Sequence, residues 1–130
     1  MVDYRLFIAA AEAQDARNTF ATAQTNQADT QLPAGLRHFY TVCDPADVEI
    51  LLSDLTSIKL TPLHGLAPLQ QEYSLVEHGF VFATREGDPI ACLNGEIVTW
   101  AHGSRHPTVE KLADDFDSWL EKVVADMKEL

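Results

Sequence analysis

The sequence has no long hydrophobic run, which excludes one class of protein at once. No stretch approaches the ~18 consecutive apolar residues that a membrane-spanning helix needs, although 46% of the 130 residues are hydrophobic, as in ordinary globular proteins. Asp3 stands where a signal peptide would carry basic residues. The sequence therefore predicts a single cytoplasmic domain over residues 1–130, without contact with a membrane.

Cysteines and basic residues are also scarce. The two cysteines, Cys43 and Cys92, lie far apart and form no Cys-x-x-Cys motif, so we expect packed thiols, without a disulfide, zinc or another cofactor. Nine basic residues stand against 20 acidic residues, which gives a net charge of −11. Such a field repels nucleic-acid phosphates and attracts basic surfaces, so we predict a protein partner and no direct nucleic-acid binding.

Catalytic motifs are missing too. The sequence has no Gly-x-Ser-x-Gly elbow, no phosphate-binding Walker loop and no Gly-x-Gly-x-x-Gly fingerprint. His102 and His106 have a spacing that could hold a metal on a helix, but Gly103 and Pro107 indicate a loop. We therefore interpret them as surface histidines and name no catalytic, cofactor-binding or metal-binding residue.

Helical periodicity marks the N-terminal part of the chain. A helix is expected from an N-cap at Asp3 to about Ala23, with an apolar stripe that is mostly alanine and holds the helix weakly. The stripe comprises Leu6, Ala9, Ala10, Ala13, Ala16 and Phe20. Residues 24–31 are predicted to be a loop. A short second helix should follow Pro33, bury Leu36, Phe39 and Tyr40, and end before residue 44.

Alternating patterns predict an antiparallel meander of about four to six strands. Candidate strands cover residues 47–52, 57–60, 80–84, 89–93 and 96–100, with a long connection over 61–77. Asn94-Gly95 is a strong hairpin signal, because both residues tolerate a positive φ. We expect the heavier face to form the main core: Phe80, Phe82, Ala91, Leu93, Val98 and Trp100. The other face carries Val81, Ala83, Ile90, Cys92, Ile97 and Thr99.

The C-terminal segment predicts a long helix that begins at Pro107-Thr108 and covers the sheet. Its apolar stripe is Val109, Leu112, Phe116, Trp119, Leu120, Val123, Val124, Met127 and Leu130. Trp100 and Trp119 fit the core pattern. Asp114, Asp115 and Asp117 lie off the stripe, on an acidic flank that we predict to be the partner-binding surface.

With the elements in this order, the chain resembles the SUKH superfamily, which includes fungal cell-wall assembly regulators and bacterial toxin-immunity proteins. Residues 32–40 resemble its Leu-Pro segment and the helix that ends in aromatics. Residues 87–102 resemble its Gly-Asp-Pro hairpin, and residues 112–120 resemble its closing helix. The resemblance spans residues 32–124; the chain departs from the family at residues 41–45 and at Asp115, where the family usually has serine.

The resemblance implies an α+β fold, an antiparallel sheet flanked by helices, and the neutralisation of a toxin by binding. It carries no catalytic residue over to this sequence. We expect an immunity protein that occludes the active site of a basic toxin domain, either a nuclease or a deaminase. Two alternatives stay open: a regulatory or scaffold module, and a small ligand- or metal-binding enzyme that uses the loop histidines with Cys92.

Overall fold

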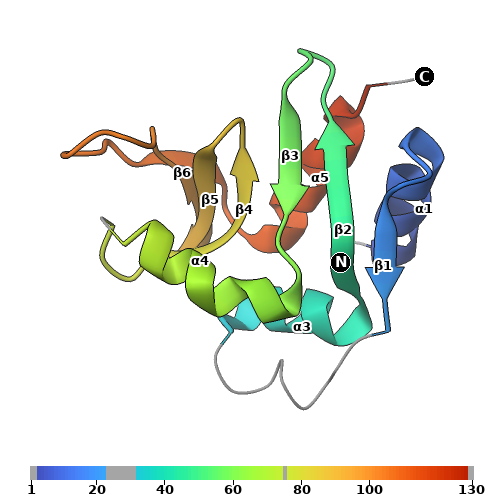
Figure 1. Cartoon of the computed structure of the whole chain (residues 1–130), viewed down its shortest axis with the longest axis horizontal. Helices are drawn as coiled ribbons and strands as arrows, with labels where there is room; N and C mark the ends of the chain where they lie inside the picture. The colour runs from blue at the N-terminus through green and yellow to red at the C-terminus, as the bar shows by residue number, and fades with distance from the viewer. Residues whose placement is uncertain (1–2, 23–31, 75, 129–130) are drawn as a thin grey trace.

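In the described residues, the chain folds around one antiparallel sheet whose seven strands follow one another in sequence order (Figure 1). The computed structural model describes residues 3–22, 32–74 and 76–128. The strands are β1 (Thr19–Ala21), β2 (Asp44–Leu51), β3 (Ser57–Leu60), β4 (Phe80–Arg85), β5 (Asp88–Leu93), β6 (Glu96–Thr99) and β7 (Glu110–Ala113). The helices are α1 (Tyr4–Gln14), α3 (Ala34–Val42), α4 (Leu66–Glu72) and α5 (Phe116–Asp126), with a 3-10 turn η1 (Leu63–Gly65).

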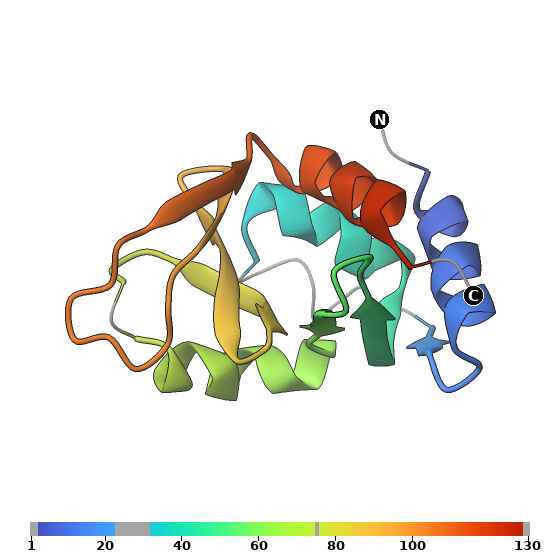
Figure 2. The ribbon, with the colours of Figure 1, turned by 90° about the horizontal axis from the view of Figure 1, so that it is seen from above.

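The predicted α+β meander is confirmed, but the sheet has seven strands and not four to six. Helices lie on both of its faces (Figure 2). α3 and α5 cover one face, and α4 lies against the other. In the described residues, no helix is both long enough and apolar enough to cross a membrane.

The N-terminal helix begins as predicted and ends earlier. Asp3 is its N-cap and accepts a hydrogen bond from the backbone N–H of Arg5 at 3.0 Å. The helix ends at Gln14 instead of continuing to Ala23, and β1 pairs with β2. Asn18 explains the change, because its side chain donates to the Ala11 carbonyl at 2.8 Å and accepts from the Glu49 N–H at 2.9 Å. These bonds stabilise a turn in place of further helix. The loop predicted at residues 24–31 lies outside the described residues.

The predicted alanine stripe of this helix does not face the core. The buried residues of α1 are Tyr4, Phe7 and Ala11, whereas Leu6 is 68% exposed. Burial of two aromatic rings removes more apolar area from water than burial of alanines. Phe7 packs edge-on against Phe39 with 6.2 Å between ring centroids. The aromatic residues therefore decide which face of the helix turns inward.

The second helix matches its prediction. α3 follows Pro33, buries Leu36, Phe39 and Tyr40, and ends before β2. The hydroxyl of Tyr40 donates to the Thr61 carbonyl at 2.6 Å. This bond ties the helix to the connection between β3 and η1.

The two strand pairings predicted beside the turns of the meander are confirmed, with Thr84 opposite Pro89 and Leu93 opposite Glu96. Asn94 and Gly95 have the positive φ angles, 52° and 85°, that the hairpin turn requires.

The prediction of the main core face was wrong. The large core contains Phe82, Ala83, Ile90, Cys92 and Ile97, whereas Val81, Ala91, Val98 and Trp100 form a smaller cluster with Leu69 and Tyr73. A break in the β4–β5 register between Val81 and Ala83 is the reason. This bulge places Phe82 and Ala83 in the same core, where strict alternation would separate them.

The predicted C-terminal helix is a strand followed by a shorter helix. Residues 110–113 form β7 at the edge of β6, and α5 begins at Phe116 with Asp115 as its N-cap. Val109 and Val124 are exposed, Met127 bridges to Leu52, and Leu130 lies outside the described residues. The unpaired edge of β6 explains the change, because pairing with residues 110–113 satisfies its backbone groups.

Aromatic rings join α5 to the rest of the core. The Phe116 ring lies 5.1 Å from that of Phe39 and 5.5 Å from that of Phe82, measured between centroids. Trp100 and Trp119 are each 4% exposed, so the prediction that both are core residues is confirmed.

We predict that Phe116→Ala lowers the free energy of unfolding by about 3–5 kcal/mol, because it removes the ring of α5 that packs against α3 and β4 and leaves a cavity. Urea denaturation followed by circular dichroism measures the change. Val124→Ala on the same helix is the control, and its half-exposed position should cost less than about 1 kcal/mol. Equal losses in the two variants would contradict this account of the core.

Candidate protein-binding surface

The three aspartates predicted to bind a partner lie close together in sequence but occupy different structural positions. Asp114 lies in the turn after β7 and Asp115 caps α5, so only Asp117 belongs to the helix. The prediction that all three lie on a helix flank was therefore wrong. Their common feature is access to solvent: Asp114 and Asp115 are exposed, and Asp117 is half-buried.

Asp114 forms an ion pair with Lys111, whose ammonium also lies 3.1 Å from a carboxylate oxygen of Glu96. The hydrogen bond from Lys111 lowers the pKa of Asp114. One lysine thus serves two carboxylates, and the group of three side chains keeps a net negative charge.

Asp115 accepts a hydrogen bond from the backbone N–H of Ser118 at 2.7 Å. This bond lowers the pKa of Asp115. The carboxylate sits at the N-terminus of α5, where free N–H groups and the helix dipole favour a negative charge. The carboxylate therefore caps the helix and is also exposed to solvent.

Asp117 connects the two terminal helices, because its carboxylate accepts a hydrogen bond from the Tyr4 hydroxyl at 2.6 Å. Tyr4 is buried beneath it, and burial, followed by the bond to Asp117, raises the pKa of the tyrosine. The bond places the acidic start of α5 beside the start of α1.

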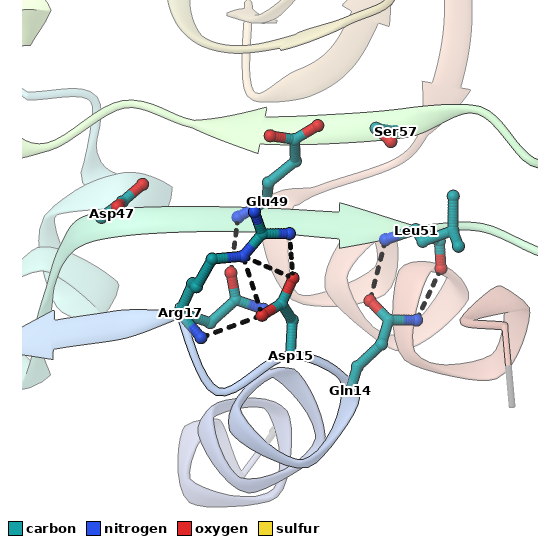
Figure 3. Close-up of a pocket in the computed structure, with 8 residues that line it drawn as sticks. Gln14, Asp15, Arg17, Asp47, Glu49, Leu51 and Ser57 are labelled. Atoms are coloured by element: carbon teal, nitrogen blue, oxygen red, sulfur yellow. Dashed lines mark hydrogen bonds and ion pairs between the residues drawn. The ribbon is translucent and has the colours of Figure 1, made fainter. Parts of the chain in front are cut away.

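A second polar site lies between the end of α1 and the outer side of β2 and β3 (Figure 3). It is a cavity of about 440 Å³. The amide of Gln14 donates to the Leu51 carbonyl at 2.7 Å and accepts from its N–H at 2.8 Å. Arg17 pairs with Asp15 at 2.7 Å and lowers the pKa of that carboxyl to about 2.

Two acids of this cavity, Asp47 and Glu49, are exposed on β2. With Asp15 they outnumber the one cation, Arg17, so the cavity adds to the acidic surface. The sequence analysis missed this site, because it combines residues from α1, the following turn, β2 and β3. The alternating pattern over residues 47–52 was the one available signal, and it identified a strand and not a cavity.

Among the described residues, the histidines and cysteines belong to no cluster that could hold a metal ion. Residues 101–109 form neither helix nor strand, as predicted for the loop that holds His102 and His106. Nδ1 of His102 lies 2.6 Å from a carboxylate oxygen of Asp88. Across residues 3–22, 32–74 and 76–128, no three His, Cys, Asp or Glu side chains are placed to share a metal ion.

Cys43 and Cys92 are buried and free. Burial raises the pKa of Cys43 to about 12 and also raises that of Cys92. Because the thiolate is the reactive form, both are weak nucleophiles at neutral pH.

No protein-family model and no curated protein matches this chain.

The cap at Asp115 makes stability depend on pH in a defined direction. A folded-state pKa below the unfolded value means that the carboxylate stabilises the fold above about pH 4 and loses this effect as the pH falls through the folded value. We therefore predict that the difference in urea midpoint between wild type and Asp115→Ala is constant from pH 7 to 5 and shrinks below about pH 4.

Asp115→Asn is the matched control, since asparagine keeps a capping oxygen and does not titrate there. Its advantage over Asp115→Ala should persist at low pH. A difference between wild type and Asp115→Ala that stays the same down to pH 3 would refute the role of the ionised cap.

Proposed function

We propose that this chain is a non-enzymatic binding protein of the immunity type, which neutralises a basic toxin domain by covering its active site. The observation that carries the proposal is the position of the charge. Asn18 is the one buried polar residue of the part of the chain that the structure describes, so the acids of that part all reach the surface. The acids of the described residues carry most of the net charge of −11, and this charge is thus open to partners.

The start of α5 favours a basic partner for a local reason. Asp115 and Asp117 form no ion pair with another described residue, although each accepts a hydrogen bond. These bonds come from neutral donors and leave both charges in place. Fixed, exposed charges accelerate the encounter with a surface of opposite sign and favour one orientation of docking.

The class of partner follows from the same electrostatics together with the SUKH resemblance. A nuclease or a nucleic-acid deaminase holds a polyanion and therefore has a basic active site. An acidic protein can compete for that site without any catalytic residue. The resemblance at residues 32–124 supports toxin neutralisation over a general scaffold role.

The test is co-expression with the product of the adjacent gene, because immunity genes lie beside their toxins. We expect the adjacent product to stop growth of a host cell, this chain to restore growth, and the two purified proteins to form a stoichiometric complex. Lysozyme, a basic protein unrelated to such a toxin, controls for unspecific attraction. An adjacent product that neither harms the host nor binds this chain would overturn the proposal.

Within that complex, replacement of Asp114, Asp115 and Asp117 together by asparagine should lower the association rate constant about 3- to 10-fold at low salt. Its dependence on salt should become flatter, while the dissociation rate changes little. Asparagine keeps the cap at residue 115 and an acceptor at residue 117, so the fold should tolerate the change. Stopped-flow fluorescence at two ionic strengths measures both rates.

The matched control is Glu72→Gln, Glu77→Gln and Glu86→Gln in one variant, which removes the same charge from exposed positions near α4 and the β4–β5 turn. Equal slowing by both variants would mean that net charge alone matters. An unchanged rate in the aspartate variant would move the interface away from α5.

A further inference from the structure

An open groove runs between α1 and α5 on the outside of the molecule; it is mostly apolar beside Leu6 and partly polar where Gln14 and Lys128 line it. The two helices lie side by side, with α1 at the β1 edge of the sheet and α5 behind β2 and β3 (Figures 1 and 2). Two cavities of about 410 and 460 Å³ follow one another along them and share Val124 and Ala125 as lining residues. The α1 wall contributes Leu6, Ala10 and Ala13.

The groove exists because α1 has two apolar faces and the fold buries one of them. Tyr4, Phe7 and Ala11 enter the core. Leu6, Ala10 and Ala13 recur at steps of four and three residues and therefore share a second face. That face is the part of the predicted core stripe that lies on α1, and in the structure it lines the groove.

The groove exposes large hydrophobic side chains, which are few among the described residues of this protein. Leu6 is 68% exposed and Val124 36%, and both belong to the few large hydrophobic side chains exposed in the described residues. Alanines beside them leave room for a helix backbone to approach closely. Covering such apolar area is favourable, because it removes apolar surface from water.

Charge around the groove limits what can cover it. Glu121 and Asp3 line one end, where Asp3 is already paired with Arg5. Asp117 lies one helical turn before Glu121 on the same side of α5. Lys128 lies at the other end. A second copy of this chain would bring an equally acidic surface, with its own net charge of −11, whereas a basic segment would compensate the acids.

We infer that this groove binds an amphipathic helix of a basic partner protein. The apolar face of that helix packs on Leu6, Val124 and the alanines, and its lysines or arginines lie against Glu121 and Asp117. α1 has 11 residues, so the groove is roughly 16 Å long and fits about three helical turns. The inference rests on the proposed function in so far as the partner is a basic protein.

The first experiment uses a labelled 18-residue helical peptide with leucines on one face and lysines on its flanks. Its twin carries glutamate in place of each lysine. Fluorescence anisotropy with the full chain should detect binding of the lysine peptide and none of the glutamate peptide. Glu121→Gln should weaken binding of the lysine peptide and reduce its dependence on salt.

A matched pair of variants locates the site. Leu6→Gln in the groove should weaken binding of the lysine peptide about tenfold, whereas Leu55→Gln should change it less than twofold. Leu55 is 65% exposed, nearly as much as Leu6, but lies in the turn between β2 and β3. Both positions are on the surface, and thermal denaturation confirms that both variants fold. Equal effects of the two variants, or equal binding of the two peptides, would overturn the inference.

Two further measurements separate this inference from the proposed function. If sedimentation shows that wild type forms a dimer which Leu6→Gln abolishes, the occupant is a second copy and the inference is wrong. If the product of the adjacent gene binds wild type and Leu6→Gln equally well, the groove inference fails and the proposed function stands. If the lysine peptide binds the groove and the adjacent product does not bind the chain, the proposed function fails and the groove remains a helix-binding site.

Discussion

The contact of Phe116 with Phe39 and Phe82 joins α5 to α3 and to the sheet. The three rings come from α5, α3 and β4, and their centroids lie 5.1 and 5.5 Å apart in the two pairs that include Phe116. No other described ring touches both of these partners directly. Because the contact joins residues distant in sequence, it decides that α3 and α5 share one face of the sheet. The position of the acidic start of α5 follows from it.

Polar contacts at both ends of α1 complement the burial of Tyr4 and Phe7 in the core. Tyr4 donates to Asp117 at one end of the helix, and Gln14 binds the backbone of Leu51 at the other. These hydrogen bonds fix the orientation of the helix without closing its alanine face against α5. An apolar groove with acids at one end is the result. The same carboxylate, that of Asp117, thus helps to build the fold and contributes to the acidic surface proposed to bind a basic partner.

The errors of the sequence analysis share one cause. Leu112, Phe116 and Trp119 have helical spacing, yet residues 110–113 pair with β6, because hydrogen bonds at an open sheet edge outweigh a short periodic pattern. The bulge at Phe82 shifts the alternation of β4 by one residue and thereby reverses which face is the main core. Neither feature has a local signal. The cavity around Arg17 and Glu49 was missed for the same reason, since its walls come from separate segments.

The sequence by itself determined the α+β class, the helix after Pro33, the strand pairings beside the two turns of the β4–β6 meander and the N-cap at Asp3. Each of these depends on residues close along the chain, such as Asn94-Gly95, whose backbone preferences act before any tertiary contact forms. Only the tertiary structure decided which stripe of α1 is buried, that residues 19–21 and 110–113 are strands, and that Asp114, Asp115 and Asp117 have three different partners. Distant segments compete for burial in the core and for pairing with a strand edge. The outcome depends on which aromatic rings and which open strand edge the folded chain brings within reach.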